Sequence, residues 1–451
     1  MNKHWLITRC HDLNDKLALI YNDKDFKYSD IYNTMGLSLS FLNENNIEPG
    51  SIVSLEGDFT LYSCAMLLAL INNKNIIVPI GDVPDKRKDG YILTAQVKYR
   101  IKTQNDSYRL ETTGQKPEHP LYFRLLNDNS SGLVLFSSGT TGQPKASVLD
   151  FDKLIDKHQP MKLARRTISF LSIDHIGGIN TLLHTISQGG ALVIPHKRTP
   201  ESVFSAIYKW NAEVLPTTPT FLNMVLISRI IESGDYPSLK LITYGTEPMP
   251  PIILNKLNKL LPQVKLKQTY GLSEVGILPT KSKNDSELWV KLGNSGFDYK
   301  VIENILWIKS DFAMLGYLNA DAPFDNEGYF NTQDIVEMNG EYIKILGRKS
   351  EIINVGGEKV YPAEVEDVLL QSNNISDVTV VGCPSPITGE CVKAIIYLSK
   401  PEKYDDLRSR LFKHCKEHLE EYKIPMLFEI SKEPHHSTRF KKQRSAFQVT
   451  E

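Results

Sequence analysis

The chain has 451 residues, which is enough for two or three domains with sizeable cores. Its formal net charge of -1 gives no reason to expect nucleic acid or an anionic membrane as a partner, and the longest apolar run, residues 64–71, is too short to span a bilayer. The five cysteines are scattered and lack C-x-x-C spacing, which fits a reducing cytoplasm and argues against zinc or a disulfide framework.

The first 130 residues alternate between two kinds of pattern. Apolar residues at helical spacing predict helices at 28–43 and 61–71, and short apolar runs predict strands at 51–55 and 75–79. Such alternation is typical of a layered α/β domain. We expect the polar stretch 102–118 to be a surface loop.

A loop rich in hydroxyls and glycines follows the next predicted strand, residues 133–136. Hydroxyls and backbone amides can donate to phosphate oxygens, glycines let the backbone approach an anion, and a lysine adds positive charge. The residues of this kind are Ser137, Ser138, Gly139, Thr140, Thr141, Gly142 and Lys145. The spacing is not that of a Walker A loop. The alternative is an ordinary surface turn. Asp150 is a predicted N-cap for a helix that begins at residue 151.

The same alternation continues after this loop. We expect a strand at 167–173, then Asp174 and His175, a helix ending at 187 and a strand at 191–194. A histidine next to glycines is as easily structural as functional.

The second half of the chain carries further strands and motifs. Strands are predicted at 305–308 and 342–345, and the composition changes after Arg348. The last hundred residues predict a small α+β unit, with helices at 362–370 and 404–419 and strands at 378–382 and 392–398.

Five segments, in this order along the chain, resemble motifs of the adenylate-forming superfamily, which includes acyl- and aryl-CoA ligases, peptide-synthetase adenylation domains and luciferase. They are residues 137–146, 269–274, 328–334, 347–351 and 355–366. The resemblance implies a large AMP-binding domain with several layered α/β subdomains and an acyl pocket, residues 1–349. A small mobile α+β domain, residues 350–451, would follow it.

The resemblance also implies a role for particular residues around a nucleotide. Gly245, Thr246 and Glu247 resemble the adenine-side loop. Tyr270 would stack on adenine, Gly271 would allow close backbone approach, and Ser273 would donate to the α-phosphate. Glu274, with Thr141, would hold Mg²⁺. Asp334 matches the carboxylate that accepts the ribose hydroxyls, and Arg348 a second ribose or phosphate contact.

The resemblance also implies that the small domain contributes residues to the site. Gly356 and Gly357 resemble the loop that lines a pantetheine channel. Lys441 matches the catalytic lysine, with Lys442 as the alternative, although Phe440 stands where glycine is usual. Ser350 likewise departs from the usual acidic or lysine hinge residue.

His175 lies where the family carries an aromatic residue or histidine beside the acyl pocket, and we include it among the catalytic candidates. Enzymes for α-amino acids have an aspartate there, and Asp174 is one residue out of register. Because an unpaired buried ammonium would be costly, we expect the acid not to be an α-amino acid.

These residues imply ATP-dependent activation of a small fatty or aromatic carboxylic acid as acyl-AMP, followed by transfer to the thiol of coenzyme A. ATP, Mg²⁺ and CoA would be required. Two alternatives stay open: transfer to an acyl carrier protein, and a nucleotide-binding relative that no longer catalyses.

Overall fold

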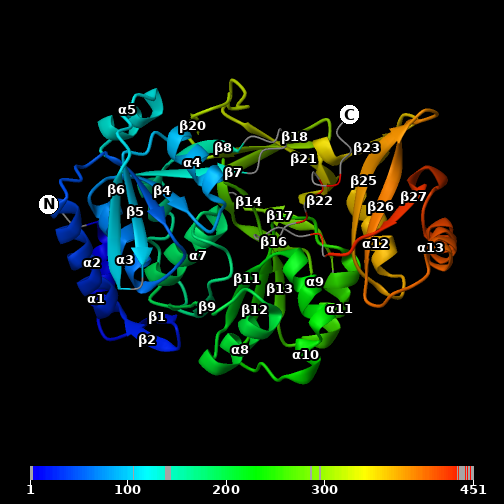
Figure 1. Ribbon diagram of the computed structural model, residues 1–451, viewed down its shortest axis with the longest axis horizontal. Coiled ribbons are helices and arrows are strands. Elements are labelled where there is room, and N and C mark those ends of the chain that lie inside the picture. The colour runs from blue at the N-terminus through cyan, green and yellow to red at the C-terminus, as the bar shows by residue number, and fades with distance from the viewer. Residues whose placement is uncertain are drawn as a thin grey trace.

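The computed structural model describes residues 4–104, 106–137, 144–284, 287–293 and 296–433, together with residues 435, 442, 444 and 447. It has two unequal parts (Figure 1): a large one built on three sheets, and a small one at the opposite end of the molecule from the N-terminal helices. The predicted combination of a large layered α/β domain and a smaller α+β domain is confirmed. The predicted boundary at residues 349 and 350 stays a prediction.

The first seven-stranded sheet of the large domain carries the predicted phosphate loop. Its strands are ordered β20-β8-β7-β4-β3-β5-β6, with a parallel centre and antiparallel edges. The buried centre explains why β4 is apolar on both faces. The strands are β3 (Ile52–Glu56), β4 (Ile76–Ile80), β5 (Tyr99–Gln104), β6 (Ser107–Thr112), β7 (Gly132–Ser137), β8 (Lys145–Asp150) and β20 (Gly316–Tyr317).

The second seven-stranded sheet, ordered β13-β12-β11-β9-β10-β1-β2, is parallel except for its β1–β2 edge. Its strands are β1 (Leu17–Tyr21), β2 (Lys24–Lys27), β9 (Arg166–Ile168), β10 (Ala191–Val193), β11 (Val214–Thr217), β12 (Leu241–Tyr244) and β13 (Lys265–Gln268). The short hairpin of β14 (Tyr270–Leu272) and β15 (Gly276–Leu278) follows it.

The third sheet of the large domain is wholly antiparallel, with the order β16-β17-β22-β21-β19-β18. Its strands are β16 (Thr280–Ser282), β17 (Val290–Leu292), β18 (Phe297–Ile302), β19 (Ile305–Ser310), β21 (Phe330–Asn339) and β22 (Tyr342–Arg348). A 3-10 turn, η1 (Lys349–Glu351), leads out of β22 into the small domain.

The small domain has one sheet, ordered β24-β23-β26-β25, with β27 paired to β26. Helix α12 packs on this sheet through β25, and α13 contacts α12. The elements are β23 (Ile353–Val355), β24 (Glu358–Val360), α12 (Pro362–Leu370), β25 (Ile375–Ser385), β26 (Gly389–Leu398), α13 (Tyr404–His418), η2 (Glu421–Lys423) and β27 (Leu427–Ile430).

Eleven helices of the described residues belong to the large domain. They are α1 (Trp5–Leu13), α2 (Tyr28–Glu44), α3 (Leu61–Asn72), α4 (Asp85–Thr94), α5 (Pro120–Asn127), α6 (Phe151–Asp156), α7 (Ile176–Ser187), α8 (Pro200–Trp210), α9 (Pro219–Ser228), α10 (Ile230–Ser233) and α11 (Pro251–Leu260). Asp150 accepts a hydrogen bond from the Lys153 amide at 3.2 Å, which confirms its predicted role as N-cap of α6. Across the described chain, no helix combines the length and the apolar composition needed to cross a bilayer.

Two predictions from local pattern were wrong. The stretch 102–118 is not a loop throughout, because β5 reaches Gln104 and β6 forms the edge strand beside it. Tyr108 on β6 packs against the aromatic rings of Phe41 and Tyr62, while Arg109 faces solvent. An edge strand with one solvated face has a polar composition that resembles a loop. The predicted strand 167–173 is also shorter, since β9 ends at residue 168.

Candidate active site

Three predicted nucleotide-binding side chains form one hydrogen-bonded network. Asp334 and Arg348 are cross-strand partners on β21 and β22, and Arg348 Nε lies 2.7 Å from Asp334 Oδ1. The Tyr270 hydroxyl donates to Asp334 Oδ2 at 2.5 Å. Arg348 also donates to the Thr332 carbonyl at 3.1 Å. The sequence therefore folds so that residues 78 positions apart meet around one carboxylate.

Burial dominates the electrostatics of this network. Asp334 is 6% exposed, and its desolvation raises the pKa of the carboxyl although the Arg348 charge acts in the opposite direction. The negative charge of Glu274 also raises the pKa of Asp334. Desolvation and Asp334 together raise the pKa of Tyr270, so its hydroxyl stays a neutral hydrogen-bond donor.

Tyr317 joins the predicted metal ligand to the predicted phosphate loop, and sequence reasoning missed it. Its hydroxyl donates to Glu274 Oε1 at 2.8 Å, and Lys145 Nζ lies 5.2 Å from the centroid of its ring. Gly316 and Tyr317 form the two-residue strand β20, which pairs with β8 just beyond Lys145. A strand this short leaves no periodic pattern by which the sequence could have revealed it.

The two ends of the phosphate loop are held side by side. Ser137 closes β7 and Lys145 opens β8, and the two are register partners across the antiparallel pair. The residues predicted to contact phosphate between them, Ser138, Gly139, Thr140, Thr141 and Gly142, lie outside the described residues, as does Lys441.

Neighbouring backbone leaves no room for a side chain at the two glycines predicted to lie near adenine. A Cβ on Gly245 would lie 2.6 Å from the Thr269 carbonyl oxygen, and a Cβ on Gly271 would lie 2.7 Å from the Gly276 carbonyl oxygen. Thr246, between the glycine and Glu247, has a positive φ of 73°. Gly245 therefore allows the close backbone contact after β12, and Gly271 allows the close pairing of β14 with β15. Their predicted approach to adenine stays a prediction.

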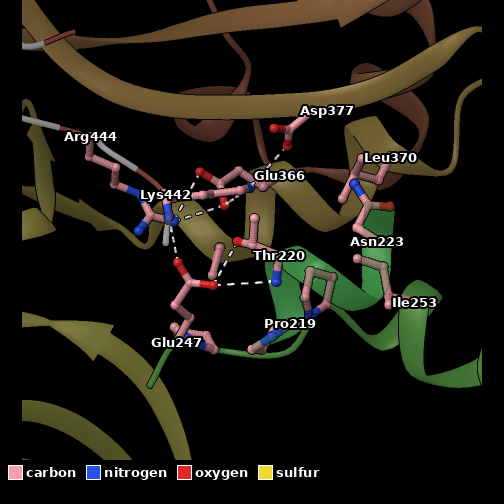
Figure 2. A pocket seen from close by; sticks show the side chains of 13 residues that line it. Pro219, Thr220, Asn223, Glu247, Ile253, Glu366, Leu370, Asp377, Lys442 and Arg444 are labelled. Carbon is pink, nitrogen blue, oxygen red and sulfur yellow. Dashed lines mark hydrogen bonds and ion pairs between the residues drawn. The ribbon is translucent and has the colours of Figure 1, made fainter. Parts of the chain in front are cut away.

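Glu247 joins the large domain to the C-terminal segment. Its Oε2 accepts from the Thr220 hydroxyl at 2.7 Å, and its Oε1 accepts from the Lys442 amide at 2.5 Å (Figure 2). These residues line a pocket between the two domains, to which α12 contributes Glu366. Glu247 is thus placed beside the tail that carries the predicted catalytic lysine.

Lys442 and Arg444 have structural partners in the small domain. Lys442 Nζ lies 2.9 Å from Glu366 Oε2 and donates to the Val378 carbonyl at 2.6 Å, and Arg444 contacts both oxygens of Glu366. These cations lower the pKa of Glu366 against the effect of its burial. The ammonium of Lys442 is therefore committed to Glu366 in this arrangement.

His175 is the N-cap of α7, and its Nδ1 accepts from the Gly177 amide at 3.0 Å. Asp174 is 6% exposed, and its carboxylate accepts a hydrogen bond from the Ser172 hydroxyl. Its Cγ lies 3.0 Å from the position that a Cβ on Gly81 would take. Asp174 thus packs into the interior against Gly81. The gating role of His175 stays a prediction.

The predicted pantetheine loop is an open turn between β23 and β24. Gly356 and Gly357 have φ values of 59° and 97°, and the Gly356 amide donates to the Thr388 carbonyl at 2.9 Å. A Cβ on Gly357 would meet nothing within 4 Å. Both glycines are therefore required by the backbone conformation, and Gly357 leaves space on its outer side.

The donor set around Glu274 fits a nucleotide-bound Mg²⁺ better than a resident metal. Among the described residues there is no group of three or more His, Cys, Asp or Glu side chains that could hold a metal ion. Mg²⁺ in nucleotide sites binds one or two carboxylates and takes its other ligands from phosphate and water. One half-buried carboxylate beside the ends of the phosphate loop meets that requirement.

Comparisons with known proteins agree with this geometry. The chain is 26% identical to an indoleacetate–CoA ligase of Aromatoleum aromaticum over 84% of this chain and 85% of that protein. It is 25% identical to a 2-succinylbenzoate–CoA ligase of Bacillus pumilus over 98% and 96%. The anthranilate CoA ligase AuaEII in complex with anthranoyl-AMP superposes with a TM-score of 0.81 at 17% identity, covering 98% of this chain and 96% of that one.

The o-succinylbenzoate CoA synthetase of Bacillus subtilis in complex with its acyl-adenylate superposes with a TM-score of 0.79 at 18% identity, covering 100% of this chain and 99% of that one. At such identities the superpositions show the fold. The sequence itself matches the AMP-binding enzyme family over residues 7–303 and the C-terminal domain of AMP-binding enzymes over residues 364–441. The chain therefore belongs to the family of AMP-binding enzymes, which confirms the resemblance to the adenylate-forming superfamily.

Proposed function

We propose that this enzyme activates a carboxylic acid with ATP and transfers the acyl group to the thiol of coenzyme A. The observation that carries the proposal is the network of Tyr270, Asp334 and Arg348, together with Glu274, which Tyr317 links to Lys145 at one end of the phosphate loop. A buried carboxylate held by a cationic fork and a phenol is suited to bind a polar sugar, and a second carboxylate beside it is suited to the charge of the phosphates.

In the first step, an oxygen of the substrate carboxylate attacks the α-phosphorus of ATP, the bond to the β-phosphate bridging oxygen breaks, and pyrophosphate leaves. Bound Mg²⁺ would neutralise charge on the phosphates. Asp334 and Arg348 would hold the ribose, and Tyr317 would orient the Glu274 carboxylate through its hydrogen bond. Such a step depends on positioning and charge stabilisation more than on proton transfer.

In the second step, the thiol of CoA loses its proton and attacks the acyl carbon, a C–S bond forms and AMP leaves. We propose that the small domain turns about residues 349 and 350 between the steps, so that Lys441 serves the first and the Gly356–Gly357 loop the second. The open space beside Gly357 supports a passage for the pantetheine arm.

We also propose a cytoplasmic location, supported by five free cysteines that are all buried.

The test is pyrophosphate release with a panel of carboxylic acids, with and without CoA. Pyrophosphate release that depends on the acid, followed by CoA consumption, is expected. Asp334→Asn should raise the KM for ATP, whereas the exposed Asp405→Asn on α13 is the matched control and should not. A protein that binds ATP but releases no pyrophosphate with any acid would contradict the proposal, and transfer only to a carrier protein would correct its second step.

A further inference from the structure

Helix α7 has two partly accessible polar side chains, and its other residues are buried. Every residue from Ile176 to Ser187 is buried except Asn180 and His184, which are half-buried. Residues four apart lie on the same face of a helix. Asn180 and His184 therefore form the one partly accessible polar stripe of an otherwise buried helix.

Lys157, just after α6, reaches this stripe. Its Nζ donates to the Ile277 carbonyl of β15 at 2.8 Å and lies 3.5 Å from Asn180 Oδ1. The rings of Phe297 and Phe312 lie 6.0 and 5.7 Å from the ammonium. Within the described part of the chain, no carboxylate lies within ion-pair distance of Lys157.

The groups around Lys157 are also basic. The rings of His158 and His184 are 5.8 Å apart. The positive charges of Lys157 and Lys162 act on both histidines, and that of Lys267 on β13 acts on His184. Each charge that acts on Lys157, His158, His184 and Lys267 belongs to another cationic or basic group.

This accumulation of cations is unfavourable without a counter-charge. Burial, followed by the positive charge of Lys162, lowers the pKa of Lys157 to about 8. Burial and neighbouring lysines also lower the pKa of His184 and of Lys267. An anion placed among them would relieve the repulsion and favour their charged forms.

The cluster lies at a distance from the reacting end of the site. His184 follows His175, the N-cap of α7, by nine residues, or about 13 Å at the rise of a helix. Ile277, whose carbonyl holds Lys157, follows Glu274 by three residues, or about 10 Å at most along an extended chain. An acid whose activated carboxylate lay near Glu274 and His175 could therefore extend its other end to Lys157 and His184.

We propose that Lys157, His184 and Lys267, with the exposed Lys162 adding positive charge, bind a second carboxylate at the end of the substrate remote from the activated one. The substrate is then a dicarboxylic acid. Asn180 holds the Lys157 ammonium in place, and Phe297 and Phe312 give it an apolar surround in which an anion is bound more strongly than in water. This specificity rests on the proposed acid activation at the same site.

The experiment compares adipic, suberic and sebacic acids with hexanoic, octanoic and decanoic acids. The first readout is kcat/KM for pyrophosphate release, and the second is the Tm of the enzyme with each acid and no ATP, at constant ionic strength. We expect at least one diacid to be preferred over its monoacid and to raise Tm. Lys157→Gln and His184→Gln should each lower the diacid-to-monoacid ratio of kcat/KM by about tenfold to a hundredfold, and Lys157→Arg should retain most of it.

Lys413→Gln, at an exposed position of α13, is the matched control and should leave the ratio unchanged. Equal use of diacids and monoacids, with no effect of Lys157→Gln on the ratio, would overturn the second carboxylate site while leaving acid activation intact. A diacid-specific rise in Tm that Lys157→Gln abolishes, without pyrophosphate release from any acid, would support the site and reject the proposed activity. Failure of every diacid to change Tm or kcat/KM in the wild type would overturn the inference.

Discussion

The backbone amide of Ile252 in the large domain donates to Asp367 Oδ1 in the small domain at 3.0 Å. Ile252 is the second residue of α11, whose own N-cap is Pro250 and supplies no side-chain hydrogen bond. Asp367, on α12, therefore caps a helix of the other domain. A carboxylate at a helix N-terminus satisfies a free amide and interacts favourably with the helix dipole.

If the small domain rotates during turnover, the cap between Asp367 and Ile252 can exist in only one of its two positions. Asp367→Ala should lower the free energy of unfolding by about 1 kcal/mol and change the rates of acid activation and thioester formation by unequal factors. Unfolding in urea and separate assays of the two half-reactions measure this. The exposed Asp406→Ala on α13 is the control. Equal effects on both half-reactions would show that the cap does not distinguish the two positions.

The hydroxyl of Tyr270 should matter for stability as well as for nucleotide binding. Tyr270→Phe keeps the ring but leaves buried Asp334 without one donor, so we expect a loss of about 1 to 3 kcal/mol in unfolding free energy and a higher KM for ATP. Tyr329→Phe is a chemically matched control, because Tyr329 donates to exposed Asp298 at 2.6 Å. That substitution should cost less than about 0.5 kcal/mol. Equal losses in the two variants would argue that burial of Asp334 is unimportant.

Stability should rise with pH through the range set by Lys157. The pKa of Lys157 is lowered from 10.5 to about 8 in the folded protein, so the unfolded chain binds a proton more readily than the folded one between these values. The unfolding free energy should therefore increase from pH 8 to pH 10.5 and be lowest below pH 8, with a contribution on the order of 1 to 3 kcal/mol. Urea melts across this range measure it.

Lys157→Met removes this titrating group and should flatten the rise, while Lys413→Met, at an exposed position, should preserve it. A bound diacid, if the second carboxylate site exists, should also flatten the rise, because it favours the charged lysine in the folded state. An identical pH profile for Lys157→Met and the wild type would contradict the lowered pKa.

Local sequence was sufficient to predict elements whose signals lie within a few residues. The helix at 362–370 was predicted with its observed bounds, because proline at its start and acidic residues in its first turn mark its beginning. The order of the motifs also brought Tyr270, Asp334 and Arg348 into one predicted site, and the structure places them in contact.

The unpredicted features depend on contacts between distant segments. The Tyr317 hydroxyl reaches Glu274 because β20 pairs with β8. A two-residue strand has no sequence pattern from which that pairing could be predicted. Lys157 and His184 belong to two separate helical regions of the sequence. Only the packing of α7 against β15 turns them into one cationic group. Local periodicity carries no information about such pairings.

The two halves of the proposed reaction should respond to different variants of the small domain. Lys441→Ala removes a positive charge expected only in the first transition state, so acid activation should slow by about a hundredfold to a thousandfold while thiol attack on pre-made acyl-AMP continues. Lys442→Ala is the neighbouring control. Its ammonium is committed to Glu366, so the variant should lose stability and should not show this selective defect. A selective defect in Lys442→Ala alone would reverse the assignment of the catalytic lysine.

Gly357→Leu should produce the opposite selectivity. Position 357 has a φ of 97° and open space beside it, so a leucine both strains the turn and fills the volume proposed for the pantetheine arm. Gly357→Ala shares the strain but adds little bulk. If the passage is real, leucine should block thioester formation far more than alanine does, and both should preserve acid activation measured as pyrophosphate release. Equal defects in the two variants would assign the effect to backbone strain. A normal rate of thioester formation with leucine would show that the thiol arrives elsewhere.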